Sequence, residues 1–149
     1  MSTKFHILDL PSESEYLEYF IENYCRQEIF TKDGIRIRFR KSHFYHAFFE
    51  TTISHKDCFS TERAQHMPEI KKILQSKNSK CHCGWDSKKR RIDPHKRVSY
   101  ILGPFVVIVL LHRNKDTGVI SGEFITCFEA EDITFNRIKS DPMWDASMI

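Results

Sequence analysis

The chain has 149 residues, of which 40% are hydrophobic and 29% are charged, and its formal net charge at pH 7 is +3. This balance is typical of a globular protein and excludes a disordered chain, and the length suits a single domain, residues 1–149. The longest apolar run, 105–111, is far too short to span a bilayer. No secretory leader opens the sequence, and the five cysteines are typical of reduced thiols, so we expect a cytoplasmic protein without a membrane segment.

The first forty residues predict a helix followed by a strand. A Pro-Ser-Glu-Ser start signal at 11–14 precedes apolar residues at helical spacing, which predicts a helix to about Phe30. After a turn, Ile35, Ile37 and Phe39 alternate with three arginines, so we expect a strand with one buried face and one charged face. The charged face consists of Arg36, Arg38 and Arg40.

Two further helices are expected before the middle of the chain. Ser42 can cap a short helix that carries two histidines. Ser60 can cap a third helix that runs to about Gln75, and Pro68 either bends this helix or marks its true start.

The C-terminal half predicts a β-meander. The stretch 76–96 is polar and basic with glycine and proline breakers, so we expect a long loop or an irregular arm there. Three β-rich runs follow, at 97–102, 105–113 and 122–130, and the tail 133–149 is expected to be a short helix or an extended flap. Together these elements predict an α+β fold in which N-terminal helices pack on a small antiparallel sheet of four strands.

Charge is separated along the chain. Residues up to Phe30 are mainly acidic, whereas 71–97 is rich in lysine and arginine. A basic segment of this kind attracts phosphate backbones, so we expect RNA as a partner, although a solvated charged loop would have the same composition. The predicted RNA-binding residues are the strand residues Arg36, Arg38 and Arg40 and the basic-segment residues Lys88, Lys89, Arg90 and Arg91.

His43 and His46 are the candidate catalytic histidines. They are three residues apart, so they share one face of a helix, directly after the arginine strand. Imidazoles beside cations suit RNA cleavage without a metal, because one group takes the 2′-hydroxyl proton, another protonates the leaving 5′-oxygen, and a cation stabilises the transition state. His46 is preferred because Phe48 and Phe49 can fix its ring, and either histidine can instead be a half-buried surface residue.

Arg63, Lys96 and Arg97 are candidate phosphate stabilisers. Arg63 opens a helix whose first amides favour an anion, and its guanidinium can hold a phosphate through two hydrogen bonds. The alternative for Arg63 is a surface ion pair with Glu62 or Glu69.

Thr126 is the remaining candidate. Alternation places it between Phe124 and Phe128 on one face of the last strand, so its hydroxyl would lie on an aromatic surface. It is either a substrate contact or a residue that merely favours a strand.

Metal and cofactor sites are not expected. His55 with Cys58 and Cys81 with Cys83 supply nitrogen and sulfur ligands, but a C-x-C spacing suits tetrahedral zinc poorly. The sequence also lacks a Gly-rich phosphate loop, a G-x-S-x-G elbow and an H-E-x-x-H motif, which argues against kinases, NTPases, serine hydrolases and metalloproteases.

The order of these parts resembles the BECR nucleases, the barnase, EndoU, colicin and RelE-like endoribonucleases, and in particular their phage-borne branch (PBECR). The last strand of that branch often ends in Thr-Ala-Tyr, whereas this chain has Thr-Cys-Phe. The resemblance covers roughly residues 35–130 and implies a metal-independent RNase, often a toxin with an antitoxin or immunity protein as partner. It is carried by HFYHAFFE with His43 and His46, FSTERAQHMPEIKKIL with Arg63, the runs RVSYILG and FVVIVLLHR, and Thr126.

Two functions are therefore predicted. The first is a metal-independent endoribonuclease that cleaves RNA by attack of the 2′-hydroxyl, leaving a 2′,3′-cyclic phosphate. The second is a non-catalytic accessory module of phage type that binds nucleic acid or a protein through the same basic residues.

Overall fold

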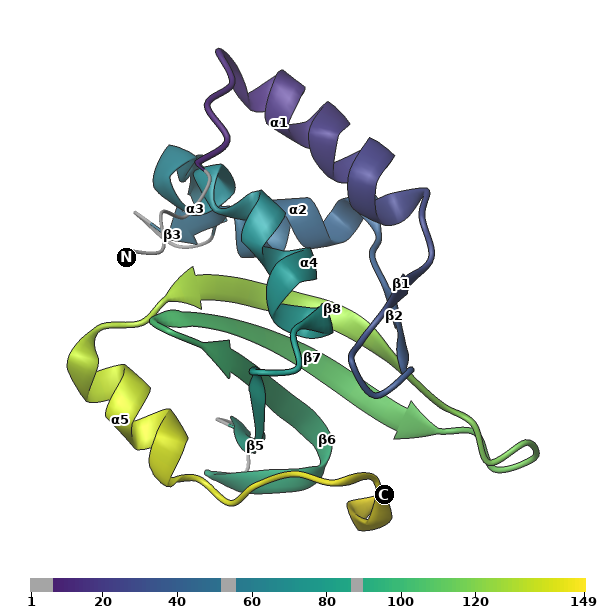
Figure 1. Cartoon of the computed structure of the whole chain (residues 1–149). Helices are drawn as coiled ribbons and strands as arrows, with labels where there is room; N and C mark the ends of the chain where they lie inside the picture. Colours follow the sequence, from purple (N-terminus) through teal and green to yellow (C-terminus); the bar gives the residue numbers. More distant parts are fainter. Residues whose placement is uncertain (1–6, 52–55, 87–89) are drawn as a thin grey trace.

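The computed structural model describes residues 7–51, 56–86 and 90–149. Within them the chain is α+β, with five α-helices and two β-sheets (Figure 1). The elements in chain order are α1 Glu13–Phe20, η1 Ile21–Cys25, β1 Ile29–Phe30, β2 Arg36–Arg38, α2 Lys41–Ala47, β3 Phe49–Thr51, β4 Lys56–Phe59, α3 Thr61–Gln65, α4 Met67–Gln75, β5 Lys80–Asp86, β6 Arg91–Leu102, β7 Phe105–Arg113, β8 Ile120–Glu129, α5 Asp132–Ser140 and η2 Ala146–Met148.

The main sheet is larger than predicted. In the described part of the chain it has six strands in the order β1-β2-β8-β7-β6-β5. All neighbouring strands are antiparallel except β2 and β8, which are parallel. The mostly antiparallel α+β class is thus confirmed, and the count of four strands is wrong, because Ile29–Phe30 (β1) and the basic segment (β5) add two strands to the arginine strand and the meander.

The expected loop at 76–96 is largely a β-hairpin. Strand β5 pairs with β6 from Lys80 opposite Ile101 to Asp86 opposite Arg91, with a register shift after Cys83. The polar composition concealed the burial of this segment, in which Cys81, His82 and Cys83 are all buried. The predicted loop is therefore wrong, because pairing with β6 satisfies the backbone of a segment that has few apolar residues.

The first helix is shorter than predicted. Ser12 Oγ accepts a hydrogen bond from the Glu15 N–H at 3.3 Å, as the start signal indicates. Helix α1 then passes into the π-helical segment η1, which ends at Cys25. Because Phe30 pairs with β2 as part of β1, the prediction of a helix to about Phe30 is wrong at its C-terminal end.

The predicted third helix is two helices. Ser60 Oγ accepts a hydrogen bond from the Arg63 N–H at 3.3 Å, so Ser60 caps α3 as expected. Helix α3 ends at Gln65, and α4 begins at Met67 after the single residue His66, with Pro68 in its first turn, where a proline costs no hydrogen bond. The side chain of His66 consequently lies at the junction between the two helices.

The helices divide the sheet into two faces. We call inner the face toward α1–α4 and outer the face on which α5 packs (Figure 1). The inner face and the helices share an aromatic core of completely or almost completely buried rings: Phe20, Phe39, Phe44, Phe48 and Phe124. On the outer face a smaller apolar cluster under α5 contains Ile101, Val106, Ala130 and Ile138.

A β-bulge in β8 changes the faces of its last residues. Thr126 pairs with Ile108, but Phe124 pairs with Val109, so one extra residue lies between them in β8. Directly opposed residues share a face, which puts Thr126 on the outer face and Phe124 on the inner face. The prediction that Thr126 lies on the same face as Phe124 is therefore wrong.

Candidate functional site

The predicted site residues separate into two groups. His43 and His46 lie on α2 and Arg63 lies on α3, which belong to the helical layer. The strand residues lie on the outer face instead, as their cross-strand partners indicate: Arg36, Arg38, Arg97 and Thr126. The catalytic residues proposed from the sequence are thus not gathered in one site.

His43 is part of a helix cap. Its Nδ1 accepts a hydrogen bond from the Arg40 N–H at 2.9 Å, so Arg40, and not the predicted Ser42, is the N-cap residue of α2. The half-buried ring packs edge-on against Phe124 at 6.1 Å between ring centres. Burial lowers the pKa of His43, and the nearby Glu123 carboxylate partly opposes this. The neutral imidazole is therefore favoured, with its proton on Nε2. His46, one turn further on, is exposed.

Part of the outer face forms an open groove of about 750 Å³. Arg36 pairs with Ser121 and Arg38 with Glu123 across β2 and β8, and all four side chains line the groove. Phe30 pairs with Arg36 from β1, lines the same groove and is 42% exposed. The alternation predicted from the sequence is confirmed here, since Ile35, Ile37 and Phe39 are buried and the three arginines are exposed.

The three arginines of this strand differ in their partners. Arg40 lies 2.9 Å from Glu123, and Arg36 lies 3.9 Å from Glu28. Arg38 forms no ion pair within the described residues. Exposed ion pairs contribute little stability, so these guanidinium groups can exchange their carboxylates for another anion at small cost.

A carboxylate lies opposite Arg38 on this face, and an imidazole lies one strand further across it. Glu123 is directly opposite Leu110, and His112 is directly opposite Ser121, so Glu123 and His112 are diagonal neighbours on β8 and β7. Such neighbours lie about 7–8 Å apart between Cα atoms. The sequence prediction missed both residues. Alternation along β7 could have predicted the position of His112, because residues 110 and 112 are the more exposed positions at the end of its apolar run.

The remaining basic residues lie along β6 and its turn. Arg97 is opposite Leu110 and half-buried on the outer face. Arg90 and Arg91 are exposed at the β5–β6 turn, where Arg90 has a φ of 53°. Lys88 and Lys89 lie outside the described residues. Lys96 belongs to β6, and its side chain lies outside the described part of the structure.

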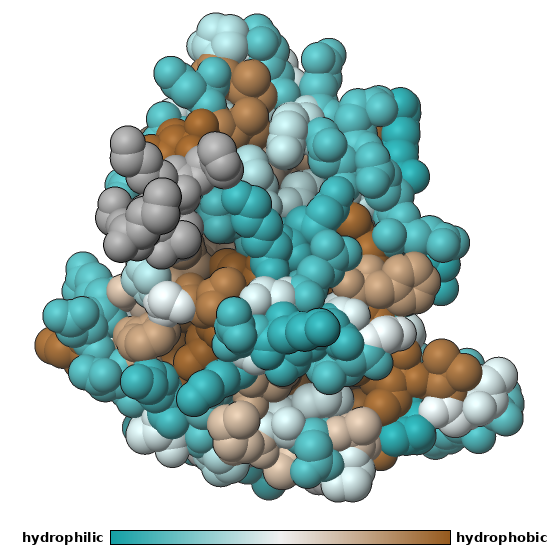
Figure 2. Space-filling model, viewed as in Figure 1, coloured by the Kyte–Doolittle hydropathy of each residue, from teal (hydrophilic) through white to brown (hydrophobic). Residues whose placement is uncertain are grey.

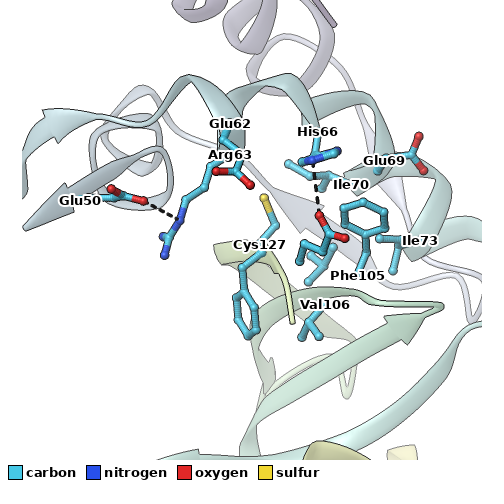
Figure 3. Close-up of a pocket in the computed structure, with 13 residues that line it drawn as sticks. Glu50, Glu62, Arg63, His66, Glu69, Ile70, Ile73, Phe105, Val106 and Cys127 are labelled. Carbon is cyan, nitrogen blue, oxygen red and sulfur yellow. Dashed lines mark ion pairs between the residues drawn. The ribbon is translucent and has the colours of Figure 1, made fainter. Parts of the chain in front are cut away.

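A second hollow lies on the inner side, between α3–α4 and the ends of β7 and β8 (Figure 3). Its volume is about 230 Å³. Arg63 Nε lies 4.0 Å from Glu50 Oε1, so the ion pair that we expected for Arg63 has a different partner. His66 Nε2 lies 3.8 Å from Glu129 Oε2, and its ring centre is 4.7 Å from that of Phe105. We call this hollow the inner pocket.

Three of the five cysteines are buried: Cys81, Cys83 and Cys127. Burial raises the pKa of Cys127 to about 12, and it raises the pKa of Cys81 to about 11, so both thiols stay protonated at neutral pH. Cys81 and Cys83 belong to the inner core, whereas His82 between them points to the other face, with Nδ1 2.8 Å from the Asp141 carbonyl oxygen. Within the described residues, no group of three His, Cys, Asp or Glu side chains is placed to hold a metal ion. His55 lies outside these residues.

In the part of the chain that the structure describes, no helix has the length and apolar character needed to cross a bilayer.

Comparison of the chain with models of protein families, with curated proteins and with solved structures gave no match.

Proposed function

We propose that the protein is a metal-independent endoribonuclease that binds single-stranded RNA in the groove of the outer face. The observation that carries this proposal is the combination of Arg36, Arg38, His112 and Glu123 along one open groove. Arginine on an exposed sheet meets phosphates through charge-assisted hydrogen bonds, and Phe30 beside Arg36 offers a ring on which an unpaired base can stack. Single-stranded RNA satisfies both features, because a duplex keeps its bases stacked inside.

The chemistry follows from the types of these side chains. In the proposed reaction the Glu123 carboxylate takes the proton of the 2′-hydroxyl, and the 2′-oxygen attacks the phosphorus. The His112 imidazolium protonates the 5′-oxygen as its bond to phosphorus breaks, which leaves a 2′,3′-cyclic phosphate. Arg38 stabilises the extra negative charge of the transition state. Imidazole suits the role of acid because it exchanges a proton near neutral pH.

This assignment replaces the two helix histidines proposed from the sequence. Nδ1 of His43 is occupied by the cap of α2, and His46 lies on the helical layer. Arg97 keeps a proposed place as a substrate contact, since it lies opposite Leu110, which lines the groove. Thr126 loses this place, because it lies opposite Ile108 beside the apolar cluster under α5 and outside the groove lining. The resemblance to the BECR nucleases supports the same reaction and adds the proposal of a toxin with a neutralising protein partner.

A non-catalytic RNA-binding module is the second candidate. The ion pair of Arg40 with Glu123 at 2.9 Å favours it, because this carboxylate already has a guanidinium partner and would have to leave it to meet the 2′-hydroxyl. The groove would then bind RNA through the same arginines without cleaving it.

Product analysis separates the two candidates. Purified protein is incubated with end-labelled single-stranded RNA in EDTA, and the fragments are tested for 2′,3′-cyclic phosphate ends. Such fragments support the nuclease. RNA that is bound but intact supports the binding module, and RNA that is neither bound nor cleaved contradicts both.

A further inference from the structure

We propose that the inner pocket is a second binding site, which takes an arginine side chain from a protein partner. It lies between the helical layer and the sheet, and its lining residues belong to β3, α3, α4, β7 and β8 and to the junction between α3 and α4 (Figure 3). The groove proposed for RNA lies on the other face of the sheet, so this inference does not depend on the proposed nuclease.

The charges of the inner pocket favour a cation. Four glutamates line it, against one arginine and one histidine. Two of the glutamates have cationic partners, Glu50 with Arg63 at 4.0 Å and Glu69 with Lys72 at 3.4 Å. The other two are Glu62, which forms no ion pair within the described residues, and Glu129, whose only ion-pair partner there is His66. This excess of carboxylates repels RNA and attracts a positively charged side chain.

The two available carboxylates come from opposite walls. Glu62 projects from α3 toward Cys127, while Arg63 reaches toward Glu50 (Figure 3). Glu129 comes from the last residue of β8 and approaches His66. A planar guanidinium with its fork of N–H donors is suited to meet carboxylates from two directions, which the compact ammonium of lysine does less well.

The floor of the pocket is apolar and suits the stem of an arginine. Phe105, Ile70 and Ile73 are buried there. Figure 2 shows hydrophobic surface near the middle of this side of the molecule, flanked by hydrophilic residues. A volume of about 230 Å³ is below the range of roughly 300–1,000 Å³ that is usual for small-molecule sites, so it fits one side chain. An arginine that anchors its methylene groups on a buried floor and its head on carboxylates is a typical interface hot spot.

Two capped tripeptides test the site directly, acetyl-Gly-Arg-Gly-amide and its neutral analogue with citrulline in place of arginine. Each is titrated into the whole protein and followed by ¹H–¹⁵N correlation NMR. We expect the arginine peptide to shift the amide signals of residues 62–66 and 127–129 with saturation in the millimolar range. We expect the citrulline peptide to bind at least tenfold more weakly, because it has the same shape without the charge.

The matched variants are Glu62→Gln with Glu129→Gln and, as a control, Glu15→Gln with Glu18→Gln on α1. All four glutamates are exposed, so both double variants should fold. The arginine peptide should bind at least tenfold more weakly to the first variant and unchanged to the control. Equal binding of the citrulline peptide, no saturable shift at the pocket, or unchanged binding by the first variant would overturn the proposal. So would a shift of these signals by a short RNA in place of the peptide. No readout depends on RNA cleavage, so failure here is distinguishable from failure of the nuclease.

Discussion

Replacement of Arg38 by alanine tests the groove with least disturbance of the fold. The side chain is exposed and forms no ion pair within the described residues, so the free energy of unfolding should change by less than about 0.5 kcal/mol. Loss of one phosphate contact should reduce the salt slope of RNA binding by about 0.7 for a single strand. Between 50 and 200 mM salt, one such contact amounts to about a 2.6-fold difference in affinity. The direct loss of affinity should be about 1 kcal/mol, roughly fivefold at fixed salt.

Fluorescence anisotropy with a labelled single-stranded oligonucleotide measures both quantities. Lys77→Ala is the matched control, because Lys77 is also exposed and forms no ion pair in the described part of the chain, but it lies in the turn between α4 and β5. We expect the control to keep wild-type affinity and slope. Folded Arg38→Ala protein with wild-type affinity and slope would refute the placement of RNA on the outer face, as would equal weakening by both substitutions.

Four further outcomes are expected. His43→Ala should lower the unfolding free energy by about 1 kcal/mol through loss of the α2 cap, with unchanged RNA cleavage; unchanged stability would contradict this role. Burial lowers the pKa of His43 below 6.5, so its contribution to stability is complete above pH 6.5 and is lost as the pH falls through the lowered value. Urea titrations at a series of pH values should therefore show a smaller acid-induced loss of unfolding free energy in His43→Ala than in wild type. Phe124→Ala should lower the unfolding free energy by about 3–5 kcal/mol in urea titrations, and a decrease below about 1 kcal/mol would contradict its position in the core. Lys88→Glu with Arg90→Glu should weaken RNA binding and flatten its salt dependence, and unchanged affinity at low salt would contradict a role of the basic segment in RNA binding.

Much of the fold could be predicted where one local signal dominates. The alternation of Ile35, Ile37 and Phe39 with arginines identified β2 and its exposed face, and Ser60 identified the start of α3. The predictions failed where tertiary pairing decides. Residues 80–86 became a strand because β6 offers hydrogen-bond partners, and Ile29–Phe30 left the first helix to pair with β2.

The candidate site was harder to predict, because it depends on register. The bulge in β8 moves Thr126 away from the face of Phe124, and no signal in the sequence marks this extra residue. His112 and Glu123 become neighbours only through the pairing of β7 with β8. The arginines of β2 could be predicted, since one strand carries them, whereas a set of residues from three strands could not.

Cleavage by His112→Ala and Glu123→Gln proteins in EDTA is the most direct test of the nuclease. Initial rates on a labelled single-stranded RNA are compared with those of wild type and of Lys77→Ala, purified identically to control for contaminating RNases. A general acid or base typically contributes about 100-fold to 10,000-fold, so we predict a loss of that order in both variants and a wild-type rate for Lys77→Ala. Binding of RNA should stay within a few-fold. Equal cleavage by all four proteins would contradict the assignment of catalysis to the outer face.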